Sequence, residues 1–268
     1  MVHVYDAPEI TPLVLDFYHS AWQSVTSTRH VFERIGLGLT QAAFRSIPRL
    51  LDLTCVDAIY AGPIARAGCG LYRPSVLSLL TTYVHSTLQE IPVNSFGLGL
   101  RRATNPLHAQ ATVYWNTFQL TKLDDPTKSI ILIYEMGEAT GSTIAGVVSE
   151  LRRLAIPAEN IIFLIGAACL EQTQMRLDAL APEIHLVIGS HWRYDPTEGP
   201  TQFYLTHMND GEWKPLPPRD WGRCVSGMTD IASVNSFIRW VAETVPMTHQ
   251  DQTLLRHEWL KKIDELPF

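Results

Sequence analysis

The chain has 268 residues, of which 46% are hydrophobic and 18% charged, and its formal net charge at pH 7 is -6. This composition is typical of a globular protein with a sizeable core. The acidic balance disfavours a general affinity for nucleic acid or for an anionic membrane surface. No apolar run approaches the roughly 20 residues that are needed to span a bilayer.

The cysteines and histidines show no arrangement typical of a metal site. Cys55, Cys69, Cys169 and Cys224 are scattered without a CxxC pair, and the 10 histidines show no HxH or HExxH spacing. This disfavours zinc and redox motifs. The N-terminus lacks a positively charged segment followed by an apolar run, so a signal peptide is not indicated. We therefore expect a reducing, cytoplasmic location.

The first part of the chain is predicted to be helical and then changes in character. Residues 8–24 and 27–46 show the helical spacing of apolar residues. Residues 58–84 are typical of a short strand, a glycine-rich turn and a helix. Residues 93–100 and 111–118 are each predicted to form a strand, and a polar segment joins them.

From residue 129 onward, strands and helices alternate. The predicted elements are strand 129–134, helix 142–155, strand 160–168, a helix around 171–180 and strand 184–190. This order predicts an α/β fold with a parallel sheet covered by helices. A turn-rich region follows, with room for one hairpin, and two helical patterns cover 231–245 and 251–266. We expect one domain over residues 1–228 and a helical extension over 229–268, packed on the domain or on a partner subunit.

The connection between strand 129–134 and the helix at 142 is the most informative stretch. Glu135 lies at the predicted strand end, and small and hydroxyl residues follow at Ala139–Thr143. Such a turn exposes backbone N–H groups at a helix N-terminus, which bind anions. A sugar phosphate suits this corner, with the phosphate on the amides and the sugar hydroxyls or Mg²⁺ on the carboxylate.

This interpretation requires the corner amides to be free. An occluded corner, or amides that already have partners, would overturn the transferase assignment and the residue roles that depend on it. The alternative is a tight connection in which Ser and Thr only cap the helix. A P-loop is disfavoured because no Lys follows Gly141, and the GxGxxG pattern is absent.

Residues 130–143, IILIYEMGEATGST, resemble the phosphoribosyl-diphosphate-binding motif of type I phosphoribosyltransferases. Other segments resemble the uracil phosphoribosyltransferase family: PIARAGCGL (63–71), GLRR (99–102), TVYWNTF (112–118), the strand–helix–strand at 158–190 and RDWGRCVSG (219–227). The resemblance covers about residues 26 to 228 in the same order. It implies an open, mainly parallel sheet flanked by helices, to which the C-terminal helices are an addition.

The resemblance also implies a reaction and its partners. Ribose 5-phosphate moves from phosphoribosyl diphosphate to a ring nitrogen of a small planar acceptor, and pyrophosphate leaves. Mg²⁺ is carried by the substrate, near Glu135, with no ligand set supplied by the protein alone. Members commonly form homodimers or larger homo-oligomers, and neither nucleic acid nor a membrane is an expected partner.

Residue roles follow from the resemblance position by position. It assigns the 5'-phosphate to Ala139, Thr140, Gly141, Ser142 and Thr143. Glu135 binds the ribose hydroxyls, and Glu138 adds a carboxylate that contacts the ribose or a metal, or points away. Pyrophosphate is assigned to Arg66, Ala67, Gly68 and Arg102. Asp220 lies by the acceptor base, and Arg219 adds a guanidinium suited to a carboxylate or phosphate. Taken singly, these arginines and Asp220 are typical of surface or turn residues.

Several positions depart from the family pattern. Glu135-Met136 stands where the family has Asp-Pro, and the segment at Trp115 lacks the Lys that helps to bind pyrophosphate. Pro217 and Pro218 remove two N–H donors from the acceptor loop. An acid expected near the end of strand 184–190 is Trp192. The changes gather around the acceptor and the pyrophosphate; Trp192, Trp221 and Arg219 suit a flat, acidic aromatic acceptor, unless the tryptophans are core residues.

Three functions remain open on the sequence. The first is a phosphoribosyltransferase that uses uracil or another planar heterocyclic or aromatic acceptor. The second is a non-catalytic protein of the same fold that binds phosphoribosyl diphosphate or a nucleotide as a regulator or partner subunit. The third is a transferase that uses an activated ribose phosphate and an acceptor other than a nucleobase.

Overall fold

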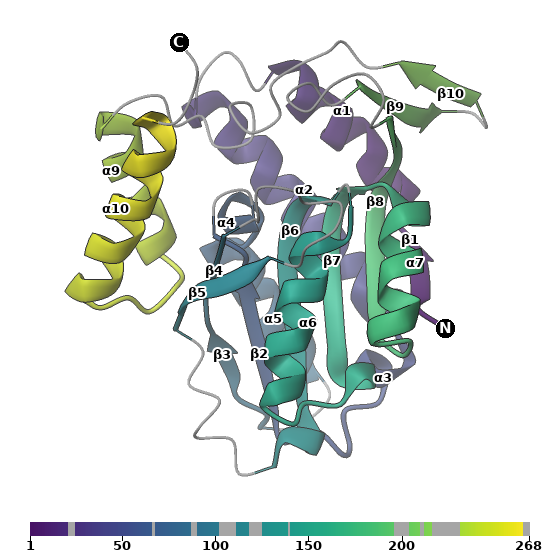
Figure 1. Ribbon diagram of the computed structural model, residues 1–268. Helices are drawn as coiled ribbons and strands as arrows, with labels where there is room; N and C mark the ends of the chain where they lie inside the picture. The colour runs from purple at the N-terminus through teal and green to yellow at the C-terminus, as the bar shows by residue number, and fades with distance from the viewer. Residues whose placement is uncertain are drawn as a thin grey trace.

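The computed structural model describes residues 1–20, 25–65, 68–86, 90–101, 111–117, 125–138, 140–195, 204–209, 212–215 and 231–264. Its centre is an eight-stranded sheet in the order β10-β9-β8-β7-β6-β2-β3, with β1 also pairing with β8 (Figure 1). The strands are β1 (His3–Asp6), β2 (Ala58–Pro63), β3 (Val93–Ser95), β6 (Ser129–Glu138), β7 (Ile161–Ala168), β8 (His185–Asp195), β9 (Tyr204–Asn209) and β10 (Glu212–Pro215).

Most of the sheet is parallel. Strands β3, β2, β6, β7, β8 and β1 pair in parallel, whereas β9 and β10 add an antiparallel end. The continuous burial of β6 and β7 is what a parallel sheet covered on both faces requires. The predicted fold class, an open and mainly parallel sheet flanked by helices with helices at the C-terminal end, is confirmed.

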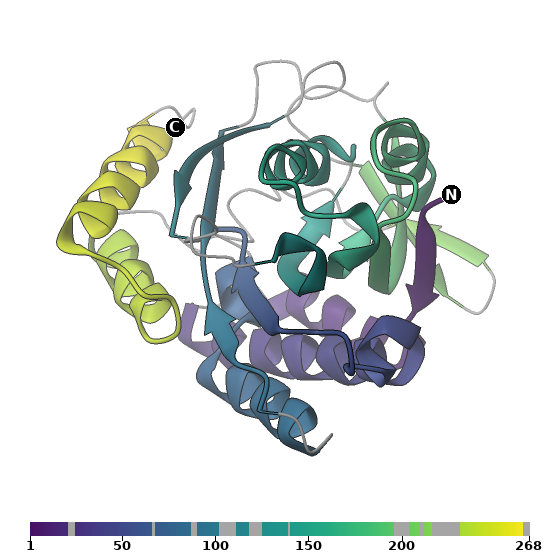
Figure 2. The ribbon, with the colours of Figure 1, turned by 90° about the horizontal axis from the view of Figure 1, so that it is seen from below.

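Helices cover the two faces of the sheet (Figure 2). On one face lie α1 (Thr11–Ser20), α2 (Val25–Ser46), α3 (Pro48–Leu51), α4 (Gly68–Leu71) and α5 (Pro74–Ser86); on the other lie α6 (Ser142–Arg153) and α7 (Leu170–Leu180). Short 3₁₀ turns occur at η1 (Pro8–Ile10), η3 (Pro126–Lys128) and η4 (Ala158–Asn160). Alternate residues of β6 enter the two cores: Ile130 and Leu132 pack on the α2 side, and Ile131 and Ile133 on the α6 side.

The predicted strand 93–100 is divided in the structure. Phe96 N still donates to Ala61 O of β2, but Gly97 and Thr117 exchange hydrogen bonds instead. The chain thus leaves the sheet at Gly97, where a Cβ atom would lie 2.6 Å from the Trp115 ring. Beyond it, β4 (Leu98–Arg101) and β5 (Thr112–Asn116) form a separate antiparallel ribbon.

Strands β2 and β6 lie side by side at the point where the winding of the sheet reverses. The chain leaves β2 through α4 and α5 on one face and returns as β3. It leaves β6 through α6 on the opposite face and returns on the other side as β7. In such sheets the two departing loops separate, and the carboxyl ends of the two strands border a crevice.

The C-terminal helices α9 (Ile231–Ala242) and α10 (His249–Asp264) lie beside the β4–β5 ribbon (Figure 1). Trp115 Nε1 donates to Asp251 Oδ1 at 2.9 Å, and Arg101 Nε donates to a Glu258 carboxylate oxygen at 3.0 Å. Apolar residues of both helices, including Phe237, join the core on the α2 face. These contacts make the helices part of the same packed structure as β4 and β5.

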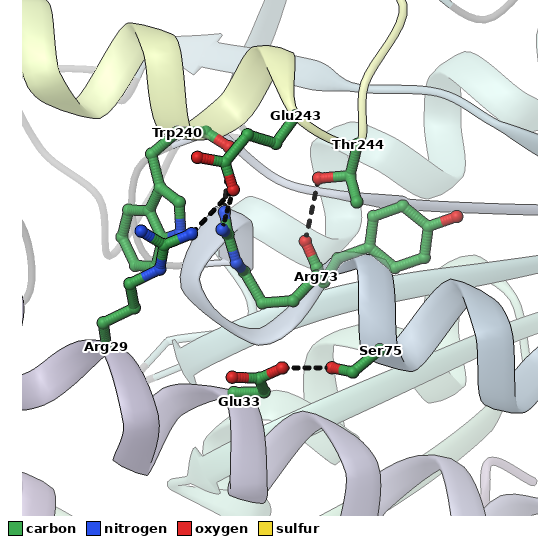
Figure 3. Close-up of polar contacts among 8 residues, drawn as sticks. Arg29, Glu33, Arg73, Ser75, Trp240, Glu243 and Thr244 are labelled. Carbon is green, nitrogen blue, oxygen red and sulfur yellow. Dashed lines mark hydrogen bonds and ion pairs between the residues drawn. The ribbon is translucent and has the colours of Figure 1, made fainter.

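A buried arginine joins α9 to the turn before α5 (Figure 3). Arg73 is 2% exposed, and its Nη1 donates to Trp240 O at 2.8 Å. Its guanidinium lies over the Trp240 ring, 4.5 Å from the centroid, and pairs with Glu243. The exposed Arg29 donates to the same carboxylate at 2.7 Å. We refer to Arg73, Trp240 and Glu243 as the Arg73 joint.

None of the helices in the described part of the chain is long and apolar enough to cross a membrane.

Candidate functional site

The loop that follows β2 lies against the carboxyl half of β6. Ile64 N donates to Tyr134 O at 3.0 Å, and α4 begins at Gly68, where a Cβ atom would lie 2.1 Å from the same carbonyl oxygen. Only glycine permits this approach. The contacts bring both sides of the predicted pyrophosphate turn next to the peptide that precedes Glu135. Arg66 and Ala67 themselves lie outside the described residues.

Strand β6 continues to Glu138, past the end predicted at residue 134, because β7 pairs with it as far as Ala168. Glu135 therefore lies inside the strand rather than at its end, and it is 5% exposed. One of its carboxylate oxygens accepts hydrogen bonds from Met136 N at 2.8 Å and Gly137 N at 3.4 Å. The prediction that Glu135 ends the strand is wrong.

The corner between β6 and α6 already holds an anionic group. Glu138 Oε1 accepts hydrogen bonds from Thr140 N at 3.1 Å and from Gly141 N at 2.8 Å. Gly141 has φ 71°, in the left-handed region, and α6 begins at Ser142. The expectation that the corner amides are free is therefore wrong for Thr140 and Gly141, because the side chain of Glu138 bends back over the turn that follows it. It is also wrong for Ser142, whose N donates to Thr140 Oγ1 at 3.4 Å.

The nature of this occupant is informative. Two successive amides converge on one carboxylate oxygen, and the positive end of the α6 dipole lies behind them. The corner thus has the anion-binding geometry that was inferred from the sequence, but in this structure the anion belongs to the chain itself.

Three buried oxygens at or beside the corner lack a hydrogen-bond partner among the residues that the structure describes. They are Glu138 Oε2, Thr143 Oγ1 and Thr173 Oγ1. The three residues are 3%, 3% and 0% exposed, in that order. Thr173 lies against the corner, since a Cβ atom on Gly141 would be 3.1 Å from its Cα. Buried polar atoms are normally paired, and although unpaired atoms also occur elsewhere in the described residues, as at Asn160 Oδ1 and Trp240 Nε1, three of them gather at this corner.

The charge of Glu138 also reaches the end of β7. Cys169 N donates to Glu138 O at 2.8 Å, and Cys169 is 4% exposed. Burial, and then the negative charge of Glu138, raise the pKa of the Cys169 thiol to about 12. Cys169 is therefore a neutral thiol at the border of the corner.

Two tryptophans near the predicted pyrophosphate and acceptor regions are bonded within the protein. Trp115 is 3% exposed and donates to Asp251 of α10. Trp192 is 4% exposed, donates to Ser190 Oγ at 2.9 Å and contacts the Tyr18 ring edge-on. These contacts favour the interpretation of Trp192 as a core residue over its interpretation as a residue that binds the acceptor.

The remaining predicted site residues fall outside the described part of the chain. They are Arg66, Ala67, Arg102, Ala139, Arg219 and Asp220, and Trp221 lies outside it as well. Arg101, which directly precedes Arg102, binds Glu258 of α10 with its guanidinium. The roles assigned to residues on the pyrophosphate and acceptor sides of the site thus stay predictions, whereas the structure describes most residues on the β6 side.

A groove that no sequence motif predicted lies between β5 and α6. It has a volume of about 330 Å³ and is lined by Ala111, Thr112, Val113, Gly146, Ser149, Glu150 and Arg153. Ala111 N donates to Ser142 O at 3.2 Å, so the start of β5 lies on the first turn of α6. Gly146 is the residue in the sequence that could have indicated this contact, because a Cβ atom there would lie 2.1 Å from Ala111 O.

The oxygen ligands near the corner are of the kind that Mg²⁺ prefers. Among the described residues, no three His, Cys, Asp or Glu side chains are grouped to hold a metal ion. Glu135 and Glu138 are three residues apart on β6, and residues at this spacing point to opposite faces of a regular strand. The two carboxylates therefore do not form a shared Mg²⁺ site in this structure, and a Mg²⁺ ion here would take its ligands mainly from water and from the phosphates of a substrate.

Comparisons with known proteins found similarity only among solved structures. A scan against protein-family models found no match, and a search of curated proteins found none. An adenine phosphoribosyltransferase from Trypanosoma brucei, in complex with AMP, pyrophosphate and ribose-5-phosphate, is 11% identical, with 67% of this chain and 80% of that chain covered and a TM-score of 0.38. An APRTase from Giardia lamblia complexed with 9-deazaadenine is 13% identical (60% and 81% covered, TM-score 0.34).

A purine phosphoribosyltransferase from Pyrococcus horikoshii Ot3 is 15% identical, with 63% of this chain and 90% of that chain covered and a TM-score of 0.33. These similarities concern the fold of the covered part of the chain.

Proposed function

We propose that this protein is a phosphoribosyltransferase that moves ribose 5-phosphate from phosphoribosyl diphosphate to uracil or another planar heterocyclic or aromatic acceptor, an acidic one included, and releases pyrophosphate. The condition of free corner amides is not met in this structure, because Glu138 occupies them. One observation still carries the proposal: the corner has the geometry to hold an anion, and it lies where the sheet reverses its winding, beside the loop after β2. Ligands of open α/β sheets bind at this place.

The β6 side of the site suits the ribose 5-phosphate half of the substrate. The amides of Thr140 and Gly141 point at one anion, and the Thr143 hydroxyl adds a donor that has no partner among the described residues. We assign the 5'-phosphate to this corner, with Ala139 and Ser142 completing it. Glu135, inside the strand, is assigned to the ribose hydroxyls.

The β2 side is assigned to the departing pyrophosphate. Gly68 lies close to β6, and Arg66 and Ala67 directly precede it in the sequence. Arg102 follows the end of β4, and Arg219 and Asp220 are assigned to the acceptor. A cation and free amides at this place would stabilise the negative charge that develops as the bond to pyrophosphate breaks.

In this reaction the protein acts mainly by positioning the two substrates. The bond between the anomeric carbon and pyrophosphate breaks, the bond to the acceptor nitrogen forms, and positive charge builds up on the ribose between the two events. We assign the carboxylate of Glu135 to stabilising that charge, and the two loops to holding the reacting groups in line. Mg²⁺, when bound with the substrate, neutralises pyrophosphate charge.

Two observations favour a second candidate, a non-catalytic protein that binds phosphoribosyl diphosphate or a nucleotide as a regulator or partner subunit. Glu138 occupies the corner amides, and β5 offers Trp115, bonded to α10, where the family has a pyrophosphate-binding Lys. The missing Lys removes a cation from the side assigned to the departing pyrophosphate, which weakens catalysis, and the occupied corner restricts entry of a phosphate, as in a regulated binding site. Cytoplasmic location and assembly into a homodimer or larger homo-oligomer belong to either candidate.

Calorimetry with phosphoribosyl diphosphate and Mg²⁺, followed by a pyrophosphate-release assay, separates the candidates. The acceptors to test are uracil, other nucleobases and aromatic acids. Binding followed by release with one acceptor supports the transferase, and binding without release on any acceptor supports the regulator. A chain that does not bind phosphoribosyl diphosphate contradicts both.

Two variants test the assigned loops. Arg66→Ala and Thr140→Val should each weaken binding of phosphoribosyl diphosphate by about tenfold or more, since each removes a hydrogen bond to a charged group. Arg45→Ala, which removes an exposed arginine of α2 that pairs with Glu9 of η1, is the matched control and should leave affinity unchanged. Unaltered affinity in Arg66→Ala would reject the pyrophosphate assignment.

A further inference from the structure

We propose that Glu138 is a built-in competitor for the phosphate of the ligand: its carboxylate occupies the corner amides in the free protein and must leave before a phosphoryl group binds there. This inference rests on the proposed function, because it takes the corner as the phosphate site. It assigns to Glu138 a regulatory contact rather than the ribose or metal contact considered from the sequence.

The first argument is that one place cannot hold both groups. Glu138 Oε1 lies 3.1 Å from Thr140 N and 2.8 Å from Gly141 N, which are hydrogen-bond distances that leave no room for a phosphate oxygen on the same two amides. A phosphate beside the carboxylate would also place like charges within a few Å, in a low-dielectric region, which is strongly unfavourable. Binding and self-occupation are therefore mutually exclusive.

The second argument is that the self-occupied state is only partly satisfied. Oε1 accepts two hydrogen bonds, but Oε2 is buried and has no partner among the described residues. Burying a carboxylate with half of its acceptor capacity unused costs free energy. The hydrogen bonds from the two amides hold Glu138 in place, whereas the unpaired oxygen favours its departure. We infer that the occupied and open states of the corner are close in free energy, so that a ligand that binds only the open state can shift the equilibrium toward it.

The third argument is that the corner keeps donors that Glu138 does not use. The hydroxyls of Thr143 and Thr173 are buried and have no partner in the described part of the chain. A phosphate has three peripheral oxygens, whereas the carboxylate offers one to this corner. An entering phosphoryl group can therefore satisfy hydroxyls that the resident side chain leaves unpaired.

The consequence is a reduced apparent affinity. When only a fraction of the molecules has an open corner, the measured dissociation constant is the intrinsic one divided by that fraction. Removing the Glu138 charge should raise the fraction and tighten binding, without any new contact to the ligand. A partner or second substrate that stabilised the displaced Glu138 would act in the same direction.

Inorganic phosphate is the probe for this inference, measured by calorimetry on the full chain. Glu138→Gln keeps the shape of the side chain and weakens the contact, and Glu138→Leu abolishes it. Both should bind phosphate more tightly than the wild type, by about tenfold or more, as expected if nine in ten molecules are self-occupied. Glu150→Gln, which removes one negative charge from the outer side of α6, is the control and should bind as the wild type does.

The outcomes separate this inference from the proposed function. Unchanged phosphate affinity in both Glu138 variants, with phosphoribosyl diphosphate still bound by the wild type, overturns the competitor role and leaves the transferase proposal standing. Tighter phosphate binding in the variants, without binding of phosphoribosyl diphosphate, supports the competitor and rejects the transferase. Equal tightening in Glu150→Gln would show a general charge effect and overturn the inference.

A second measurement needs no variant. In the wild type, saturating inorganic phosphate should shift the backbone amide resonances of Thr140 and Gly141 and the side-chain carboxyl carbon resonance of Glu138 together, since all three change partner in one step. Amide shifts without a change at Glu138 would overturn the inference, because phosphate would then bind while the carboxylate stays in place.

Discussion

The Arg73 joint and the Glu138 corner each bury a charged group, but they satisfy it differently. Arg73 is 2% exposed and has a carbonyl, a carboxylate and an aromatic face around its guanidinium. Glu138 is 3% exposed, and one of its two carboxylate oxygens has no hydrogen-bond partner in the described part of the chain. The two residues are thus buried to a similar degree, but one carboxylate oxygen of Glu138 lacks a hydrogen-bond partner among the described residues, whereas the guanidinium of Arg73 has its partners.

The difference indicates two kinds of role. A buried charge whose partners are complete holds elements together, and here Arg73 ties α9 to the turn before α5 (Figure 3). A buried charge with an unused oxygen, next to unpaired hydroxyls and a helix N-terminus, is typical of a place where a ligand enters. Measurements on the two residues should therefore diverge, in stability at one and in ligand affinity at the other.

The largest effect is expected at the joint. Arg73→Met should lower the free energy of unfolding by about 2 to 4 kcal/mol. It removes the shorter of two hydrogen bonds to the Trp240 carbonyl, which keeps only Glu243 N at 3.4 Å, and it breaks a partly buried ion pair. Urea unfolding monitored by circular dichroism measures it. Arg29→Ala, which removes the exposed partner of Glu243, is the control and should cost less than about 1 kcal/mol. Equal losses in the two variants would show that Arg73 is no special anchor.

His185 is a third buried ionisable group, and unlike Arg73 and Glu138 it is neutral in the folded protein near neutral pH. Burial, and then the charge of His3, lower the pKa of His185 from about 6.5 to about 4. Tyr5 OH lies 3.2 Å from Nδ1, and Glu159 also faces the ring and raises the pKa slightly. The neutral ring is therefore the form that suits the fold.

The sign of the pH dependence follows from that shift. As the pH falls below about 6.5, the unfolded chain takes up a proton on this histidine, whereas the folded chain does not until about pH 4. The contribution to stability is complete above pH 6.5 and is lost toward pH 4, about 2 kcal/mol in total for this partly screened group. Urea unfolding at several pH values should show a shallower decline in His185→Gln; an identical decline would exclude His185 as a source.

A smaller effect is expected from the backbone of the corner. Gly141→Ala should destabilise the protein by about 1 to 2 kcal/mol, because φ 71° is unfavourable for a residue with a Cβ atom and Thr173 lies 3.1 Å from where that atom would be. Gly141→Asn should recover part of the loss, since Asn tolerates the left-handed region better. Thermal unfolding of the two variants tests this. A loss as large in Asn as in Ala would assign the effect to the contact with Thr173 alone.

The smallest effect on stability is expected at Glu138. Glu138→Gln should change the free energy of unfolding by less than about 1 kcal/mol, since removing a half-paired buried charge offsets the weakening of two hydrogen bonds. The same urea experiment that is used for Arg73 measures it. A loss as large as that of Arg73→Met would show that Glu138 is a structural residue, and the contrast between the two regions would disappear.

Much of the architecture follows from local patterns. The alternation of apolar strands with helical patterns from residue 129 predicts the parallel sheet, and the small residues after β6 place the start of α6 at Ser142. These predictions succeed because periodicity, turn residues and helix starts depend on neighbours in the chain. The anion-binding geometry of the corner is predictable for the same reason.

Other features depend on contacts between distant segments. Pairing with β7 extends β6 to Glu138, so that Glu135 lies within the strand, and the contact of Gly97 with Trp115 and Val245 divides the predicted strand 93–100. No local pattern specifies which partner a strand end finds or how far the pairing continues. The groove beside α6 arises in the same way, from β5 meeting a helix across the chain.

The amino-acid sequence alone determined which segments are strands and helices, that they form an open α/β sheet, and that the turn after β6 favours an anion, because each of these depends on residues close together in the chain. The tertiary structure decided which anion the turn holds in the free protein and that Trp115 and Trp192 are bonded inside the protein. Those outcomes depend on burial and on competing partners, which exist only once the chain has folded.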